Sequence, residues 1–361
     1  MVAKTMEQGA HIDIIGLMSG TSLDGLDICF TRFTQKDGKW QYQIIQAESI
    51  SYPSEIKEKL ASAQLMDART FAHFHCDYGL HLGVCVREFM EKHQLRPHYI
   101  ASHGHSIFHQ PHIRFAFQIG SGAGIAAESG VDTVCDFRTT DVALYGQGAP
   151  LVPIGDRHLF GSYDYCLNIG GFSNISSEQN GKRSAYDISP VNYVLNHYTR
   201  SIGKEYDPDG EMARSGNISP ELLKELNNLD FYNKTGPKSL GREWVEEVVI
   251  PMVDSYPITL QDKLATFCEH AAYQISLNVK GGKVLVTGGG AFNKYLQERM
   301  RALAPHCTFH IPDAQTINFK EALVFAFLGA LYVSGLPNCL SSVTGARYDC
   351  IGGAMYRGKP V

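Results

Sequence analysis

One pattern that occurs twice, about 150 residues apart, constrains the fold more than any other feature of the sequence. Residues 14–27, IIGLMSGTSLDGLD, and residues 163–176, YDYCLNIGGFSNIS, each carry an apolar strand, a glycine, and a turn rich in hydroxyl or amide side chains. A further strand-like segment follows each turn. Glycine permits backbone conformations and close approaches that other residues do not, so both stretches are interpreted as glycine-broken hairpins. The repeat predicts two α/β domains of related design.

A third glycine turn, Gly288-Gly289-Gly290, lies between a strand-like segment (residues 283–287) and a helical pattern (residues 294–303). Backbone N–H groups in such turns form sites for phosphate and other anions. Three turns of this kind predict a nucleotide held from both sides in a cleft between the domains. We expect one domain in residues 1–140 plus 345–361 and the other in residues 141–344.

Charge and composition exclude several classes of protein. The 361 residues carry 32 basic and 37 acidic side chains, a net charge of −5, with no basic run, so nucleic acid and membrane surfaces are not expected partners. The nine cysteines are odd in number and form no CxxC pair, which favours reduced thiols in the cytoplasm. The most apolar run, residues 322–333, is too short to span a bilayer and predicts a buried helix.

The first glycine turn lacks the lysine of a P-loop and instead contains Asp24 and Asp27. Carboxylates repel phosphate, but they can hold Mg²⁺ or its water ligands, which would supply the positive charge. The alternative is an ordinary hairpin turn in which the aspartates bond their own backbone.

Four histidines lie within residues 102–112, SHGHSIFHQPH. His103 and His105 would share one strand face, a pattern that zinc sites use, which leaves open a metal-dependent hydrolase. Hydrogen bonding to a sugar hydroxyl, or structural packing, is favoured, because later strands end in glycine turns instead of further metal ligands.

Ten segments occur in the order that one known family shows. They are GLMSGTSLDGLD, SHGHSIFHQP, DFRTTDVALYGQGAPLVP, LNIGGFSNIS, YDISPVN, DGEMARSGNI, GPKSLGRE, VTGGGAFN, EALVFAFLGALYVSGLP and SVTGA. By these segments the chain resembles the anhydro-N-acetylmuramic acid kinases, bacterial enzymes of cell-wall recycling. That resemblance implies two actin-like (ribonuclease H-like) α/β domains with an ATP and sugar cleft between them. It also implies Mg²⁺, an amino-sugar substrate and a homodimer.

The resemblance further implies a coupled reaction. ATP would phosphorylate O6 of 1,6-anhydro-N-acetylmuramic acid while water opens the anhydro ring, giving N-acetylmuramic acid 6-phosphate and ADP. Asp187 falls at the position of the catalytic base. Residues carried over to ATP binding are Gly20, Thr21, Ser22, Asp24, Gly25, Asp27, Gly170, Gly171, Asn174, Gly288, Gly289, Gly290 and Asn293, with Asp24 and Asp27 at the metal. Those carried over to the sugar are His103, Arg138, Gln147, Gly148 and Glu321.

Two segments depart from the family pattern. The usual Asp-Thr-Gly-Pro-Gly-Asn is here Asp187-Ile188-Ser189-Pro190-Val191-Asn192, and the usual His-Gly-Gln-Thr is here His103-Gly104-His105-Ser106. No residue needed for the chemistry is lost. The alternatives are a kinase for another sugar on the same fold, a zinc hydrolase using His103 and His105, and a nucleotide-switched binding protein.

Overall fold

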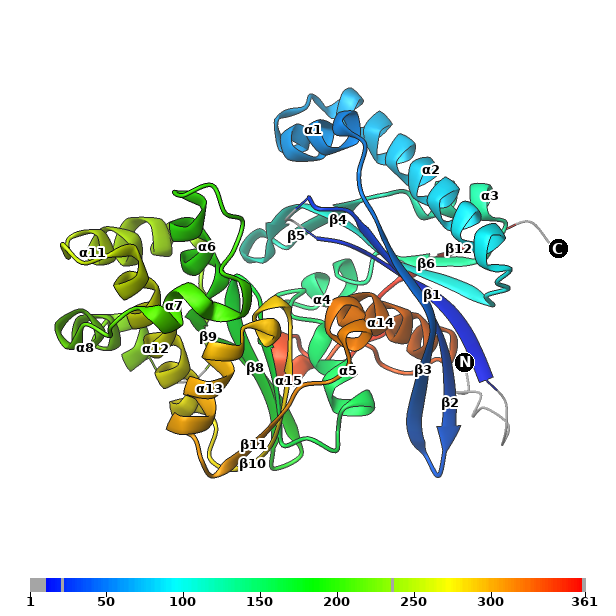
Figure 1. Ribbon diagram of the computed structural model, residues 1–361. Helices are drawn as coiled ribbons and strands as arrows, with labels where there is room; N and C mark the ends of the chain where they lie inside the picture. The colour runs from blue at the N-terminus through cyan, green and yellow to red at the C-terminus, as the bar shows by residue number, and fades with distance from the viewer. Residues whose placement is uncertain (1–10, 21–22, 235–236, 359–361) are drawn as a thin grey trace. The chain divides into compact units, whose positions relative to one another are not determined.

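A computed structural model describes residues 11–20, 23–234 and 237–358 (Figure 1). The chain forms two compact units, each considered by itself. Unit 1 comprises the chain up to Leu159 together with Phe319 onward, and unit 2 comprises Phe160–Asn318. These limits differ from the 140/141 and 344/345 boundaries expected from sequence. The difference arises because α5 packs on a strand of unit 1 and most of the apolar helix α14 belongs there. The assignment of functional domains stays a prediction.

Unit 1 is built on one mixed sheet with helices on both faces. Its strands are β1 (His11–Ser19), β2 (Leu26–Lys36), β3 (Lys39–Ile50), β4 (Tyr99–Gln110), β5 (Phe115–Ile119), β6 (Thr133–Cys135) and β12 (Ala354–Tyr356). Its helices are α1 (Ser54–Ser62), η1 (Ala63–Leu65), α2 (Ala68–His93), η2 (Pro111–Ile113), α3 (Gly122–Ser129), α4 (Thr139–Ala143), α5 (Val152–Leu159), most of α14 (Ala314–Val333) and α15 (Ser341–Thr344).

The sheet of unit 1 has the strand order β12-β6-β4-β1-β2-β3, with β5 paired to β4. β1, β2 and β3 are antiparallel, whereas β4 runs parallel to β1 and to β6. Side chains alternate along β1, so Ile15 and Leu17 join the core formed with α2. Figure 1 shows α2 along one face of this sheet and α14 along the other.

Glycine lets α14 approach β1 closely. A Cβ built on Gly16 would collide with the backbone of Ala322 and Ala326, and one built on Gly329 would lie 2.6 Å from the Cβ of Ala101 in β4. α14 is the one helix of the described residues that is long and apolar enough to cross a membrane, with 72% of its most apolar window buried. The sequence analysis predicted a buried helix here, and the helix lies in the core of unit 1.

Unit 2 repeats the strand order of unit 1. Its sheet is β11-β10-β7-β8-β9, in which β7, β8 and β9 are antiparallel and β10 runs parallel to both β7 and β11. The strands are β7 (Tyr165–Ile169), β8 (Phe172–Gln179), β9 (Lys182–Pro190), β10 (Gly282–Thr287) and β11 (Cys307–His310). Counted from each first strand, both sheets read 3-2-1-4-5 when β5 and β12 of unit 1 are left out of the count, because β6 then takes the fifth position there as β11 does in unit 2.

The helices of unit 2 build its core against one face of the sheet, where Leu167, Ile169, Val284 and Val286 meet α12 and its neighbours (Figure 1). They are α6 (Asn192–Arg200), η3 (Pro208–Gly210), α7 (Glu211–Ser215), α8 (Pro220–Asn227), α9 (Asp230–Asn233), α10 (Arg242–Trp244), the π-helical turn η4 (Val245–Val249), α11 (Ile250–Asp254), α12 (Leu260–Asn278), η5 (Gly289–Phe292) and α13 (Lys294–Leu303).

The repeated topology confirms the predicted α/β class with two related sheets, each opening on a glycine-broken hairpin. A glycine does not end every strand here, since β4 passes Gly104 and continues to Gln110. Gly104 has a φ of +69°, and the β1–β4 register shifts beside it, so the glycine allows an irregularity within the strand instead of ending it.

Candidate active site

The first glycine turn joins β1 to β2. Thr21 and Ser22, predicted phosphate ligands, lie outside the described residues. Leu23 donates its N–H to the carbonyl of Gly20 at 3.3 Å. A Cβ on Gly25 would collide with the backbone of Ile50 in β3, so this glycine is required by strand packing whether or not a ligand binds.

The two carboxylates of this turn differ in environment. Asp24 is exposed, whereas Asp27 lies half-buried at the start of β2 and accepts a hydrogen bond from the hydroxyl of Ser49 in β3. Burial raises the pKa of Asp27, the Ser49 hydrogen bond opposes that effect, and the charge of Asp24 adds to it. Two carboxylates that repel each other gain most from a shared cation, so the pair fits a divalent metal.

A buried cluster of hydroxyls lies behind the turn. We call Ser19, Tyr52, Tyr78 and His105 the Ser19 network. The hydroxyl oxygens of Ser19, Tyr52 and Tyr78 lie 2.7–2.9 Å from one another, and Nδ1 of His105 lies 2.8 Å from Ser19 Oγ. Three hydroxyls carry three protons, so all four contacts are hydrogen bonds only when Nδ1 of His105 carries the fourth. Burial lowers the pKa of His105, which keeps the ring neutral and leaves Nε2 an acceptor.

His103 and Arg138, both predicted to bind the sugar, bind each other. Arg138 donates to Nε2 of His103 from Nε and Nη2, at 3.2 and 2.8 Å, and from Nη1 to the carbonyl of Gly148 at 2.6 Å. Nδ1 of His103 donates to the carbonyl of Gly104 at 2.9 Å. Both ring nitrogens are therefore occupied. Burial and the adjacent Arg138 guanidinium hold the pKa of His103 well below its usual range, so the ring is neutral and orients Arg138.

The loop with Gln147 and Gly148 is held by a residue to which no role was assigned from sequence. Asp141 is fully buried and accepts the N–H of Gly148 at 2.8 Å and the hydroxyl of Thr344 at 2.7 Å. The N–H of Gln147 donates to the carbonyl of Thr344, which leaves the Gln147 side chain exposed. The only sequence signal for these contacts was that Asp141 and Thr344 both lie in family segments.

Glu321, on α14, retains a surface open to solvent although protein atoms surround it closely. This crowding raises its pKa, while the positive charges of Arg138 and Lys320 lower it. In unit 1 Glu321 and Arg138, both predicted to bind the sugar, therefore lie close enough for their charges to interact.

In unit 2 the second glycine turn, Gly170-Gly171, joins β7 to β8. Its carbonyls accept backbone N–H groups from the start of α6: Val191 and Tyr193 donate to Gly171 at 2.8 and 3.1 Å, and Asn192 donates to Gly170 at 3.3 Å. The turn is therefore tied to the segment that follows Asp187.

Asp187 lies on β9 directly opposite Asn174 of β8, so two predicted site residues form a cross-strand pair. Its Oδ2 accepts the N–H of Leu240 at 2.8 Å, and its own N–H donates to the carbonyl of Lys238 at 2.9 Å. Burial raises the pKa of Asp187 and the Leu240 hydrogen bond opposes that effect. A carboxylate with a raised pKa is a stronger base than an ordinary aspartate.

Two residues beside Asp187 that depart from the family pattern have defined places in unit 2. Val191 replaces a glycine of the pattern; its φ is −136°, outside the positive-φ region that favours glycine, and its side chain is buried in the core of unit 2. Ser189 takes part in a second polar cluster, the Ser189 network, with Tyr232, His270 and Asn227. Ser189 Oγ lies 3.2 Å from the Tyr232 hydroxyl, which lies 2.8 Å from Nε2 of His270, and Nδ1 of His270 lies 2.7 Å from Oδ1 of Asn227.

The third glycine turn borders a cavity of about 450 Å³ in unit 2. Gly288 has a φ of +80° and ends β10; η5 follows, and the side chain of Asn293 caps α13 by accepting the N–H of Leu296 at 2.9 Å. The cavity is lined by Asn192, Leu195, Asn196, Tyr206, Asp207, Pro208, Asp209, Gly289, Phe292 and Asn293. Exposed aromatic rings beside amide and carboxylate groups suit a nucleoside. Phe292 lies in the family segment VTGGGAFN, but no role was assigned to it from sequence, and no sequence signal marked Tyr206.

The comparisons with known proteins agree with one another. A family model described as anhydro-N-acetylmuramic acid kinase matches residues 12–358. A protein of that name from Pasteurella multocida is 35% identical over 368 residues, which cover 95% of this chain and 96% of that protein. Another, from Aliivibrio fischeri, is 36% identical over 366 residues, which cover 94% and 97%.

Similar solved structures include the activator of a 2-hydroxyisocaproyl-CoA dehydratase from Clostridium difficile with bound ADPNP. It has a TM-score of 0.44 and 12% identity and covers 90% of this chain and 96% of that one. A hexokinase from Schistosoma mansoni complexed with glucose has a TM-score of 0.33 and 10% identity and covers 90% and 87%.

Proposed function

The chain belongs to the anhydro-N-acetylmuramic acid kinase family, as its ten segments predicted, and we propose that it phosphorylates 1,6-anhydro-N-acetylmuramic acid with ATP while opening the anhydro ring. The products are N-acetylmuramic acid 6-phosphate and ADP. The proposed setting is peptidoglycan recycling in the cytoplasm, and the proposed assembly is a homodimer. Family membership carries this proposal, and the environment of Asp187 is the structural observation that supports it most directly.

Asp187 is the proposed general base. Its carboxylate takes a proton from a water molecule as the water oxygen bonds to C1 of the sugar. The C1–O6 bond breaks, O6 bonds to the γ-phosphorus of ATP, and the bond from that phosphorus to the β,γ-bridging oxygen breaks to release ADP. The Leu240 N–H fixes one carboxylate oxygen, which leaves Oδ1 for the water.

The nucleotide is proposed to bind through the glycine turns. Backbone N–H groups at Gly20 and Gly171 would contact phosphate oxygens, whereas the N–H of Gly170 already donates to the carbonyl of Phe172 at 3.0 Å. The adenosine would occupy the cavity beside Gly289 and Asn293. Mg²⁺, when bound, would neutralise phosphate charge. Asp24 and Asp27 are its proposed ligands, directly or through water, because they form an acidic pair whose charges repel each other.

The sugar is proposed to bind through Arg138, Glu321 and the Gln147-Gly148 loop. His103 acts here as a positioning residue, since both of its ring nitrogens are already bonded. The same engagement disfavours the zinc hydrolase, because metal ligation by either ring nitrogen of His103 would break a buried hydrogen bond.

Incubation of the purified chain with ATP, Mg²⁺ and the anhydro sugar in ¹⁸O-water tests the proposal. We expect a 6-phosphorylated sugar with a free reducing end, ¹⁸O at C1 and none in the phosphate. Phosphorylation of a different sugar in preference to this one would establish the same-fold alternative. Tight ATP binding without any turnover would establish the binding protein and overturn the proposal.

A further inference from the structure

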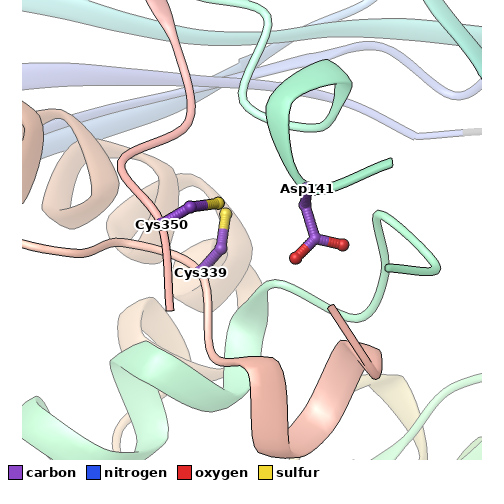
Figure 2. A group of neighbouring side chains, drawn as sticks. All are labelled: Asp141, Cys339 and Cys350. Atoms are coloured by element: carbon purple, nitrogen blue, oxygen red, sulfur yellow. The ribbon is translucent and has the colours of Figure 1, made fainter. Parts of the chain in front are cut away.

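Three buried side chains with metal-ligating atoms meet in unit 1, outside the proposed site residues. One ligand atom each from Asp141, Cys339 and Cys350 lies within 4.8 Å of the other two, and the three residues are 0%, 1% and 6% exposed (Figure 2). Figure 2 shows the two sulfurs directed at each other, with the carboxylate of Asp141 beside them. From this cluster we propose a binding site for one soft divalent cation, with zinc as its occupant.

The backbone fixes both thiols. Cys339 and Cys350 are opposite partners in an isolated antiparallel bridge, with N–H to carbonyl distances of 3.1 and 3.3 Å in the two directions. Asn338 braces this bridge, because its side chain donates to the carbonyls of Leu328 and Gly352 and accepts the N–H of Gly352. The thiols are therefore presented together by ordered backbone, as a metal site requires.

The carboxylate is fixed as well. The Gly148 N–H and the Thr344 hydroxyl each bond one oxygen of Asp141, which orients the group in the way that outer partners orient metal ligands. Some point lies within about 2.8 Å of all three ligand atoms, whereas zinc bonds are about 2.3 Å to sulfur and about 2.1 Å to oxygen. Small side-chain movements would complete these three bonds, and a water molecule would be the fourth ligand.

Charge favours a cation over a disulfide. Binding replaces two thiol protons with one divalent ion, so the net charge of the buried cluster does not change. In both states the charge of Asp141 is balanced by Arg138, which interacts with Asp141 and Cys339. A disulfide forms through a thiolate, which the neighbouring carboxylate repels, whereas a cation turns that repulsion into a third bond.

The site would join distant parts of unit 1. Asp141 lies on α4, which begins directly after Arg138. The cysteines lie on the segments before and after α15. A bound ion would cross-link these segments and so stabilise the folded chain in proportion to the logarithm of its free concentration.

Cobalt(II) titration of the reduced, metal-free, full-length chain tests the site. We expect one ion per chain with a sulfur-to-cobalt charge-transfer absorption, which one equivalent of Zn²⁺ removes. Cys350→Ser and Cys339→Ser should abolish this absorption, and Asp141→Asn should weaken binding at least about 10-fold. Cys76→Ser is the matched control, because Cys76 is exposed and outside the cluster, and it should leave the titration unchanged.

A second measurement needs no variant. Zn²⁺ should protect Cys339 and Cys350, and not Cys76, from alkylation mapped by mass spectrometry. Absence of stoichiometric cobalt binding to the wild-type chain would overturn the proposal, as would an unchanged absorption in both serine variants. A chain that is lighter by two hydrogen atoms in this pair and takes up no metal would establish a disulfide in place of the site.

Discussion

The two units share a strand order but place their acidic groups on different strands. In unit 1 the half-buried carboxylate beside the glycine turn, Asp27, begins the second strand and is held by a serine hydroxyl. In unit 2 it is Asp187, on the third strand, and it is held by a backbone N–H from outside the sheet. The shared topology thus supplies two similar turns, while strand position and hydrogen-bonding partner suit one carboxylate for metal and the other for a proton.

The polar networks differ in the same way. Each contains a serine, tyrosine and histidine, but His270 of the Ser189 network is bonded at both nitrogens and burial lowers its pKa to about 3. Within residues 11–20, 23–234 and 237–358, the only hydrogen bond of the His105 ring is to Ser19. The Ser189 network is thus closed, because both nitrogens of its histidine are bonded. The Ser19 network is open, because Nε2 of His105 can still accept a hydrogen bond.

The largest expected effect is on turnover in Asp187→Asn. An amide of the same shape keeps the Leu240 hydrogen bond but cannot take a proton, so kcat should fall roughly 10²–10⁴-fold. Steady-state kinetics measures the loss, and nucleotide titration should give an unchanged affinity. Near-normal turnover would show that Asp187 is not the general base.

The pH dependence of turnover, compared between the wild-type chain and Asp187→Asn, is a second test of the same role. Burial raises the pKa of Asp187, so wild-type activity should decline on acidification at a higher pH than an ordinary aspartate would cause. This decline should be absent from the residual activity of Asp187→Asn.

Asp27→Asn should lower kcat at limiting Mg²⁺ by roughly 100-fold, about 2.7 kcal/mol, through loss of a metal carboxylate. Asp24→Asn is the matched control and should have a smaller effect, since Asp24 is exposed. A larger loss in Asp24→Asn would reverse the order proposed for the pair.

Thermal unfolding of Asp27→Asn tests the raised pKa of Asp27 independently of catalysis. The folded-state pKa of Asp27 is raised, so its ionisation opposes folding above the unfolded pKa, and stability from this group is lost as pH rises. The neutral amide should therefore unfold at a higher temperature than wild type at pH 7 and lose this advantage near pH 3.

Phe292→Ala tests whether the nucleoside of ATP binds in the cavity of unit 2. Loss of an aromatic ring at the cavity should raise KM for ATP roughly 10-fold with little change in kcat. Phe115→Ala removes a comparably exposed ring from β5 of unit 1 and should leave KM for ATP unchanged. Equal increases in KM for ATP in the two variants would show that the nucleoside does not bind in this cavity.

The smallest effects concern the networks. Tyr78→Phe and Tyr232→Phe each remove one buried hydroxyl, and each should cost about 1–2 kcal/mol in denaturant unfolding. Only Tyr78→Phe should also change KM for ATP, because Ser19 precedes the phosphate turn directly. An equal change in KM in Tyr232→Phe would erase the distinction between the open and closed networks.

The sequence predicted what local pattern controls. Alternating apolar residues and glycine turns define the hairpins, and ten ordered segments define the family. The Ser19 network could not be predicted, because its four residues lie on β1, β4, α2 and the segment before α1, and only the fold brings them together. The same holds for Cys339 and Cys350, whose spacing matches no metal motif, and for Tyr206 and Phe292 at the cavity.

The glycines of the first hairpin carry two separate kinds of constraint. The backbone of α14 leaves no room for a Cβ at Gly16 and that of β3 leaves none at Gly25, whereas Gly20 is one of the residues proposed to bind phosphate. In a saturation mutational scan, positions 16 and 25 should therefore score as losses of soluble protein, and position 20 as loss of activity at normal abundance. Substitutions of the glycines in this one segment would therefore cause two separate defects, one in folding and one in catalysis.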